Sequence, residues 1–269
     1  MRNLFHLGRE IYQHVLLVFG VLVFCIGSLL FTLVSMPLYP LLPRIVGTRI
    51  GRSSITWYFR LYFALLEAVG IMRLDLRALD QLRGEHGLLV APNHPGLLDA
   101  ALVLSRLPDM TCIMKAAIWD SPFLGGGARL ARYIRNDSPG NMIRCATAEL
   151  REGHQLLVFP EGTRTRTQPI NAFKGGFALI AKKASVPIQT VFIETNSAFL
   201  SKDWPLWKKP AMPLVYRARL GRRFHVDGDV KAFVHELEDY FRSELGEQPS
   251  GQLAQLASTR QSGSPRHAP

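Results

Sequence analysis

The sequence predicts an α/β fold in which a mixed, mostly parallel sheet is flanked by helices and follows an N-terminal membrane-embedded helix or helical hairpin. Two observations lead to this prediction. The first is an uncharged apolar run near the N-terminus, and the second is an alternation of short apolar segments with helical segments after residue 73. Such alternation is typical of layers of helices packed on a sheet.

The composition fits a folded chain with an anionic partner. The 269 residues are 48% hydrophobic and 20% charged, which excludes a disordered, collagen-like or coiled-coil protein. The formal net charge of +11 favours nucleic acid, anionic lipid headgroups or phosphorylated substrates, and charge alone does not choose among them. The three cysteines have no paired spacing, so neither a disulfide framework nor a zinc cluster is expected.

The N-terminal run has the length of a membrane span. No Lys, Arg, Asp or Glu occurs from Ile11 to Pro43, and the 22 mostly apolar residues from Val15 to Met36 would span about 33 Å as a helix. The run is too long for the apolar core of a signal peptide, and no small-residue cleavage site follows it. Because arginines flank both ends, the positive-inside rule gives no orientation, and a hairpin with both ends in the cytoplasm would explain this symmetry.

A second amphipathic segment follows the run. Because proline lacks the N–H that a helix needs, we expect the first helix to end just after Met36, at Pro37, Pro40 and Pro43. The segment from Ile55 to Met72 contains five aromatic side chains. These suit a membrane interface or a core helix of the globular part equally well.

The chain therefore divides into three regions. We expect a membrane-embedded part at 1–54, an α/β domain at 55–245 and a tail at 246–269, which is disordered because it is rich in Gly, Ser, Gln and Pro. The strand candidates are 87–92, 110–115, 155–159 and 188–193. The helix candidates are 95–107, 142–152, 176–185 and 230–245, with a glycine-rich turn at 125–127 and an Asp229 cap before the last helix.

The first motif with chemical content follows the strand candidate that ends at Pro92. It reads Asn-His-Pro-Gly-Leu-Leu-Asp from Asn93 to Asp99, and a helix is expected to begin at Pro95. The carboxylate of Asp99 would then reach back toward the ring of His94, since helical side chains lean toward the N-terminus. This pair would form a general base and the group that orients it. The alternative is that His94 caps the helix and Asp99 only favours its first turn.

The second motif follows the strand candidate that ends at Phe159. It reads Pro-Glu-Gly-Thr-Arg-Thr-Arg over residues 160–166, and Lys174 lies just beyond it. A glycine permits close approach of the backbone to a ligand, while threonine hydroxyls and an arginine can bind phosphate oxygens. Because the carboxyl ends of parallel strands carry the ligands of α/β sheets, this loop is a candidate anion site. The alternative is a solvated basic loop.

These two motifs, about 65 residues apart, carry a resemblance to a known family. The chain resembles the glycerolipid, or lysophospholipid, acyltransferases: NHPGLLD is similar to their N-H-x4-D catalytic block, and FPEGTRTR to their F-P-E-G-T-R acceptor-binding block. The apolar N-terminus is similar to that of bacterial 1-acyl-sn-glycerol-3-phosphate acyltransferases. Two departures concern the acceptor site: the arginine of the middle block is expected nearer Asn136 than Arg135, and Gly96 stands where a serine is common.

The resemblance implies a reaction and a set of residue roles. A fatty acyl group would move from an acyl-CoA or acyl-ACP thioester to the free hydroxyl of a lysophospholipid, most directly 1-acylglycerol-3-phosphate giving phosphatidic acid. No metal and no resident cofactor would take part. His94 would be the general base and Asp99 would orient it. Acceptor binding is implied for Glu161, Gly162, Thr163, Arg164, Arg135 and Lys174. Oxyanion or supporting roles are implied for Asn93, Gly96 and Lys115.

The same resemblance implies a membrane enzyme, in the bacterial inner membrane with its catalytic domain toward the cytoplasm. Its partners would be membrane lipids, the lysophospholipid acceptor and the thioester donor, with no nucleic acid. One alternative is a same-fold acyltransferase for an amino-acid-containing lipid, a glycolipid or a specialised acyl chain. A more distant alternative is a non-enzymatic protein that binds anionic lipid through its net charge.

Overall fold

A seven-stranded mixed sheet forms the centre of the molecule. The computed structural model describes residues 2–167, 169–205 and 208–246. The strands lie in the order β1-β7-β6-β2-β5-β3-β4, and all neighbours are parallel except β6 and β7. The predicted fold class is therefore confirmed. The strand bounds are β1 Met72–Asp75, β2 Leu88–Pro92, β3 Met110–Lys115, β4 Ile134–Asn136, β5 Gln155–Leu157, β6 Ile188–Thr195 and β7 Leu214–Phe224.

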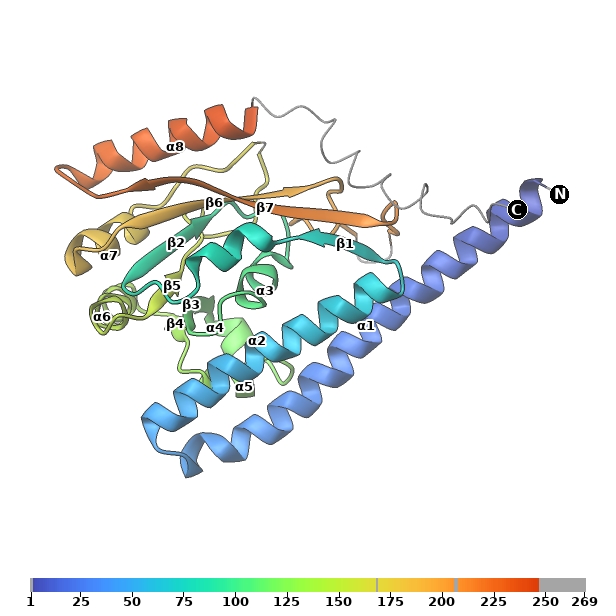
Figure 1. The fold of residues 1–269 in the computed structure, drawn as a ribbon, viewed down its shortest axis with the longest axis horizontal. Coiled ribbons are helices and arrows are strands. Elements are labelled where there is room, and N and C mark those ends of the chain that lie inside the picture. The colour runs from blue at the N-terminus through green and yellow to red at the C-terminus, as the bar shows by residue number, and fades with distance from the viewer. Residues whose placement is uncertain (1, 168, 206–207, 247–269) are drawn as a thin grey trace, which may run out of the picture.

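Helices cover both faces of this sheet (Figure 1). One face packs against η1, α2 and α3, and the other packs against α6, α7 and α8. Each face buries its own apolar cluster, as expected for strands that are hydrophobic on both sides. The helix bounds are α1 Arg2–Leu41, α2 Arg44–Ala68, η1 Arg77–Leu82, α3 Asp99–Leu104, α4 Ala116–Trp119, α5 Gly125–Leu130, α6 Pro139–Arg151, α7 Gly176–Ala184 and α8 Val230–Gly246.

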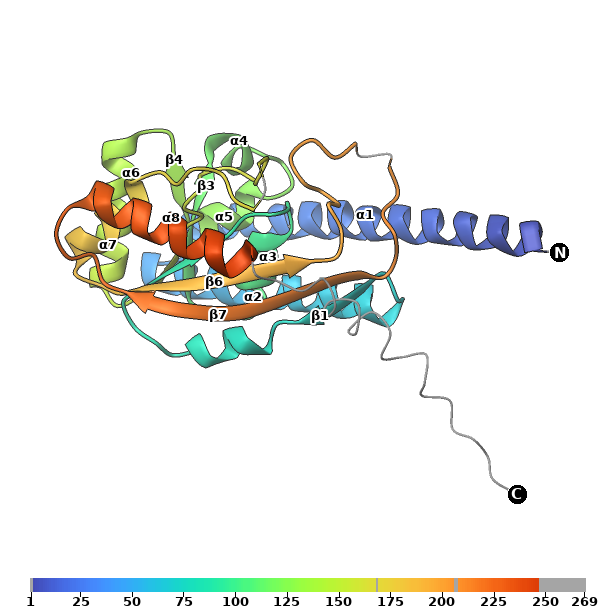
Figure 2. The same cartoon turned by 90° about the horizontal axis from the view of Figure 1, so that it is seen from above.

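Helices α1 and α2 form an antiparallel hairpin along the lower side of the body, and the N-terminal part of α1 runs past the sheet (Figures 1 and 2). The segment Gly8–Leu41 is long and apolar enough to cross a membrane by length and composition. The prediction that the prolines end this helix after Met36 is wrong, because Pro37 and Pro40 lie inside α1. Two missing N–H donors within the last turns weaken the helix locally without ending it. The chain turns at Pro43, the N-cap residue of α2.

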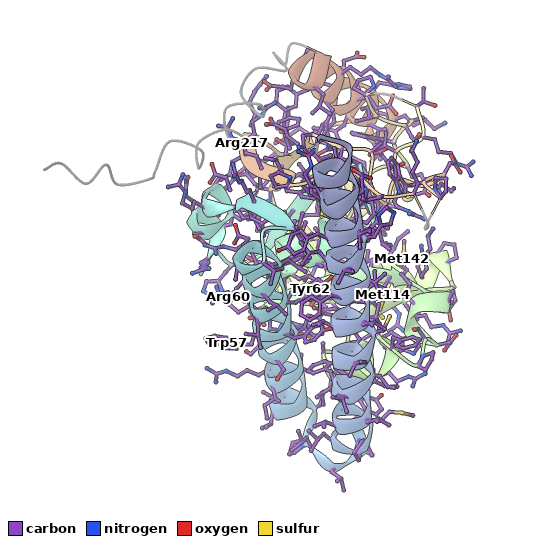
Figure 3. The ribbon with its side chains drawn as sticks, turned by 90° about the vertical axis from the view of Figure 1, so that its right-hand side faces the viewer. Trp57, Arg60, Tyr62, Met114, Met142 and Arg217 are labelled. Carbon is purple, nitrogen blue, oxygen red and sulfur yellow. The ribbon has the colours of Figure 1, made fainter. Side chains whose placement is uncertain are left out.

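Helix α2, which contains the second amphipathic segment, has one buried side and one exposed side. Its inner side, with Phe59, Phe63 and other buried residues, belongs to the core under the sheet. Trp57 and Leu61 on its outer side are 68% and 73% exposed. Figure 3 shows Tyr62 between the two helices of the hairpin and Trp57 pointing away from them. Because α2 runs through residue 54, the helix crosses the boundary expected between the first two regions.

Three glycines at 125–127 start helix α5 instead of forming the predicted turn. A Cβ on Gly126 would meet the backbone oxygen of Thr32 at 2.7 Å, and one on Gly127 would meet the ring of Phe31 at 2.4 Å. The glycines thus let α1 lie directly on α5, which fixes the hairpin to the body. Apart from Gly246, which ends α8, the predicted tail at 246–269 lies outside the described residues.

Candidate active site

The two motif loops meet because the strands before them are neighbours. Strands β2 and β5 pair in parallel, so the loops that leave their carboxyl ends lie side by side. The backbone N–H of Thr165 donates to the carbonyl of His94 at 2.7 Å, which joins the second loop directly to the first. The predicted position of both motifs, at strand ends of one sheet, agrees with this geometry, and the structure adds that the two strands are neighbours.

His94 and Asp99 form a hydrogen-bonded pair. The distance from His94 Nδ1 to Asp99 Oδ2 is 2.8 Å. The helix expected from Pro95 begins only at Asp99, because residues 95–98 form a loop held from outside: the N–H of Leu97 donates to the carbonyl of Leu200 at 3.1 Å. Asp99 therefore reaches His94 from the first helical position, and the N–H of Gly96 donates to the same carboxylate oxygen at 2.7 Å.

Asp99 is fully buried, whereas the His94 side chain is 16% exposed. Burial raises the pKa of Asp99 above its ordinary value, and the hydrogen bonds from His94 and Gly96 and the charge of Arg164 oppose that rise. The ring of His94 also stacks on Phe159, with centroids 3.9 Å apart and planes 20° apart. No spacing in the sequence predicts this stacking, since the two residues come from separate loops.

Glu161 joins the loops and does not line the cavity. Its side chain accepts hydrogen bonds from the N–H of His94 at 2.9 Å, from the N–H of Asn171 at 2.8 Å and from the hydroxyl of Thr165 at 2.9 Å. Glu161 is 1% exposed, and burial raises the pKa of its carboxyl despite these three donors. The resemblance implies acceptor binding for Glu161, but its carboxylate instead holds the two loops together.

A cavity of about 370 Å³ opens beside His94. Its polar wall contains Thr163, Arg164 and Lys174 from the second loop and Lys115 from the end of β3. Its apolar wall includes Met114 and Met142, labelled in Figure 3. Further apolar lining residues are Leu97, Ile113, Ile118, Val158, Phe177 and Ile180. The lining of the cavity therefore combines cationic and apolar side chains.

The second loop owes its shape to Gly162 and Arg164. Gly162 has a φ of +65°, which favours glycine, and a Cβ there would lie 2.9 Å from the aliphatic chain of Lys174. Arg164 donates through Nη1 to the carbonyls of Leu200 and Ser201 at 3.0 and 3.1 Å. Both residues line the cavity, as the sequence predicts for an acceptor site.

Three predicted site residues lie elsewhere. Arg135 forms ion pairs with Asp120 at 3.1 Å and Asp137 at 3.0 Å, and its neighbour Asn136 lines the cavity instead. Asn93 exchanges two hydrogen bonds with the backbone of Ile193, so its side chain ties β2 to β6. Gly96 is beside Asp99, and its N–H is already donated there.

The family model described as Acyltransferase matches residues 73–194, which include both loops and the pair at their centre. Over these residues the chain is similar to the acyltransferase family, and the predicted resemblance to this family of enzymes is therefore confirmed.

Curated proteins similar to this chain come from bacteria and plants. A 1-acyl-sn-glycerol-3-phosphate acyltransferase of Helicobacter pylori is 27% identical over 170 residues, covering 60% of this chain and 67% of the relative. The coconut enzyme of the same name is 35% identical, covering 36% and 33%. A lyso-ornithine lipid O-acyltransferase of Pseudomonas aeruginosa is 33% identical, covering 39% and 42%. The chain thus matches between a third and two thirds of the length of these relatives.

A solved structure has the same fold as this chain. The 1-acyl-sn-glycerophosphate acyltransferase PlsC of Thermotoga maritima superposes with a TM-score of 0.68, covering 90% of this chain and 99% of the other. Sequence identity is 18%, so the likeness concerns the fold, including the arrangement of the sheet and its helices.

Proposed function

We propose that this chain transfers a fatty acyl group from an acyl-CoA or acyl-ACP thioester to the free hydroxyl of a lysophospholipid, with 1-acylglycerol-3-phosphate as acceptor and phosphatidic acid as product. The observation that carries the proposal is the 2.8 Å contact between His94 and Asp99 beside a cavity lined by Thr163, Arg164 and Lys174. A base next to cationic and hydroxyl groups suits a substrate whose hydroxyl lies near a phosphate. The relatives from H. pylori and coconut are named for this activity.

The pair would act as follows. Asp99 accepts the Nδ1 proton of His94, which leaves Nε2 as the nitrogen that can take a proton from the acceptor hydroxyl. The hydroxyl oxygen attacks the thioester carbonyl as its proton moves to Nε2. The tetrahedral intermediate then collapses, the carbon–sulfur bond breaks, and the thiolate takes the proton from His94. The acceptor supplies the nucleophile, so no covalent acyl-enzyme is needed.

The oxyanion of the intermediate needs a donor, and the backbone near His94 offers few. Pro95 has no N–H, while the N–H groups of Gly96 and Leu97 are donated to Asp99 and to the carbonyl of Leu200. Lys115 lines the cavity and carries an ammonium group. We assign Lys115 to the oxyanion because a positive charge there favours the developing negative charge.

The membrane would supply the lipid acceptor. The apolar hairpin suits insertion into the bilayer, and we propose the cytoplasmic face of a bacterial inner membrane, where acyl thioesters are made. The net charge of +11 favours anionic lipid headgroups at this surface.

Acyl transfer by membranes that contain the wild-type chain or its His94→Ala variant tests the proposal. Lysophosphatidate is offered with acyl-CoA and acyl-ACP in parallel. Loss of a general base costs about 10² to 10⁴ in rate, so phosphatidate should form only with the wild type. His154→Ala serves as the matched control, because His154 contacts Asp109 and lies outside the cavity. Wild-type turnover by His94→Ala would overturn the mechanism.

The contacts of Arg135 favour a second candidate acceptor, a lysolipid without phosphate, which the same assay can test. The guanidinium of Arg135 forms ion pairs with Asp120 and Asp137, so one cation implied for the acceptor phosphate is engaged elsewhere. A phosphate-free, amino-acid-containing lysolipid would not need it, and the P. aeruginosa relative is named for lyso-ornithine lipid. His94-dependent acylation of lyso-ornithine lipid, with none of lysophosphatidate, would favour this second candidate.

A further inference from the structure

Five cationic side chains gather around the mouth of the catalytic cavity. Lys115, Arg164 and Lys174 line the cavity itself. Lys202 and Arg166 lie next to them: Lys202 Nζ is 3.3 Å from the hydroxyl of Thr163, and Arg166 follows in the same loop. The first three have roles in the proposed reaction. Lys202 and Arg166, which we call the outer basic pair, have none so far.

The outer basic pair carries more positive charge than its neighbours neutralise. Asp203 approaches Arg166 at 3.8 Å, but the side chains are 77% and 56% exposed, so water screens this contact. Burial lowers the pKa of Lys202, the charges of Arg166, Lys115 and Arg164 lower it further, and the charge of Asp203 opposes them in part. These cations therefore act on one another, and an anion between them would relieve their repulsion.

Hydrogen bonds hold the backbone around the outer basic pair. The side-chain oxygen of Asn171 accepts from the N–H groups of Arg166 and Thr167 at 3.0 and 3.2 Å. On the other side, Arg164 donates to the carbonyls of Leu200 and Ser201, directly before Lys202. Both cations thus stand on segments that are tied to the catalytic loops, as a preorganised ligand site requires.

We propose that Lys202 and Arg166 bind the phosphate of the acyl donor. This inference rests on the proposed function, in which Arg164 and Lys174 bind the acceptor. The acyl thioesters of coenzyme A and of acyl carrier protein share a pantetheine arm that ends in phosphate, so one basic pair outside the cavity can receive either donor. Lys202 contacts Thr163, which lines the cavity together with His94, whereas Lys202 and Arg166 do not line it themselves. A donor with its thioester at His94 would then carry its phosphate past Thr163 toward the outer basic pair.

The first experiment measures binding, which does not depend on turnover. Purified full-length chain is titrated with coenzyme A and with pantetheine, which lacks phosphate. We compare the wild type with Lys202→Gln/Arg166→Gln and with Lys231→Gln, which removes an exposed cation at the start of α8. The double variant should bind coenzyme A about fivefold to tenfold more weakly, the control should match the wild type, and pantetheine affinity should not change. Equal affinity of the double variant and wild type for coenzyme A would overturn the inference.

Steady-state kinetics then distinguish acyl-CoA from acyl-ACP, and an effect on the donor from an effect on the acceptor. The double variant should raise KM for acyl-CoA and acyl-ACP while KM for acyl-pantetheine and for the acceptor stay unchanged. A rise with acyl-CoA alone would assign the pair to the nucleotide phosphates, and a rise with acyl-ACP alone to the phosphate of the carrier. A rise in acceptor KM alone would overturn the inference. If no donor supports transfer but coenzyme A binding still depends on Lys202, the proposed function fails and the phosphate site stands.

Discussion

At the scale of single residues, Asp99 uses its two carboxylate oxygens unequally. Oδ2 accepts from His94 and from Gly96, whereas Oδ1 is buried and has no hydrogen-bond partner in the part of the chain that the structure describes. A buried acceptor without a partner costs about 1 to 3 kcal/mol. The arrangement favours the orientation of His94 at the expense of stability, as is common at catalytic sites.

The first prediction follows from this unpaired oxygen. A Cβ on Gly96 would lie 3.5 Å from Asp99 Oδ1, an ordinary contact, so the hydroxyl of a Gly96→Ser variant can donate to it. We expect a higher melting temperature, by the equivalent of about 1 kcal/mol, with activity retained. Gly96→Ala adds the same Cβ without a donor and is the control. Equal melting temperatures for the Ser and Ala variants would contradict the prediction.

Glu161 gives a prediction about pH. Its pKa is raised by burial above the ordinary 4.5, so the folded protein keeps a proton there that the unfolded chain has released. The stabilisation of the folded protein by this proton is fully present below the ordinary pKa of 4.5, and it is lost as pH rises through the raised pKa of the folded protein. Glu161→Gln cannot titrate but loses hydrogen bonds. The variant should therefore melt below the wild type by a margin that shrinks as pH rises above 4.5, measured by scanning calorimetry. A margin that is constant or grows would contradict the shift.

At the scale of elements, the contact of α1 with α5 depends on the absence of a side chain. Because the Cβ of a Gly126→Ala variant would lie 2.7 Å from the backbone oxygen of Thr32, the helices must separate. We expect destabilisation by about 1 to 3 kcal/mol, measured as a lower melting temperature. Gly140→Ala in α6 has nothing within 4 Å of its Cβ and should be neutral or stabilising by up to about 1 kcal/mol. A Gly126→Ala variant as stable as Gly140→Ala would contradict this packing.

The elements also differ in how far the sequence predicts them. Local signals identify α8, because Asp229 Oδ1 accepts from the N–H groups of Lys231 and Ala232 as an N-cap. Local signals do not identify β7, because its arginines are typical of a solvent-exposed segment. Arg219 in fact pairs with Glu194 at 2.7 Å and with Glu244 at 2.7 Å, partners from other elements. A strand whose arginines find their partners in distant elements carries little periodic signal of its own.

In the candidate site too, the sequence predicts some features and not others. The sequence motifs locate His94, Asp99 and the loop with Arg164, because the residues of each motif are neighbours in the chain. The contact of Arg164 with the carbonyls of Leu200 and Ser201 joins distant segments, so no spacing predicts it. The same holds for the stacking of Phe159 on His94.

At the scale of the whole molecule, the hairpin leaves a continuous apolar surface on its outer side. Val34 on α1 is 61% exposed and Leu61 on α2 is 73% exposed, and similar side chains extend along both helices. Soluble monomers rarely expose such a surface, which marks a lipid or protein contact. Lys209 meanwhile joins the loop before β7 to α1, through Glu10 and Gln13 at 2.7 Å. Helix α1 is thus held to the body at α5 and at this loop, while α2 packs into the core under the sheet.

This surface leads to the last prediction. If it faces lipid, a charge on it must be buried in the bilayer, at a cost of about 2.5 to 3.5 kcal/mol at the centre of a span and less near the interface. Val34→Glu and Leu61→Glu together should lower binding to anionic vesicles at least about tenfold in flotation assays. Ala232→Glu, which adds one charge at an exposed position of α8, is the control and should float like the wild type. Because both substituted positions are exposed, the variant should keep its fold by circular dichroism. Unchanged flotation of a folded Val34→Glu/Leu61→Glu variant would mean that the outer side of the hairpin meets a protein partner and not the lipid.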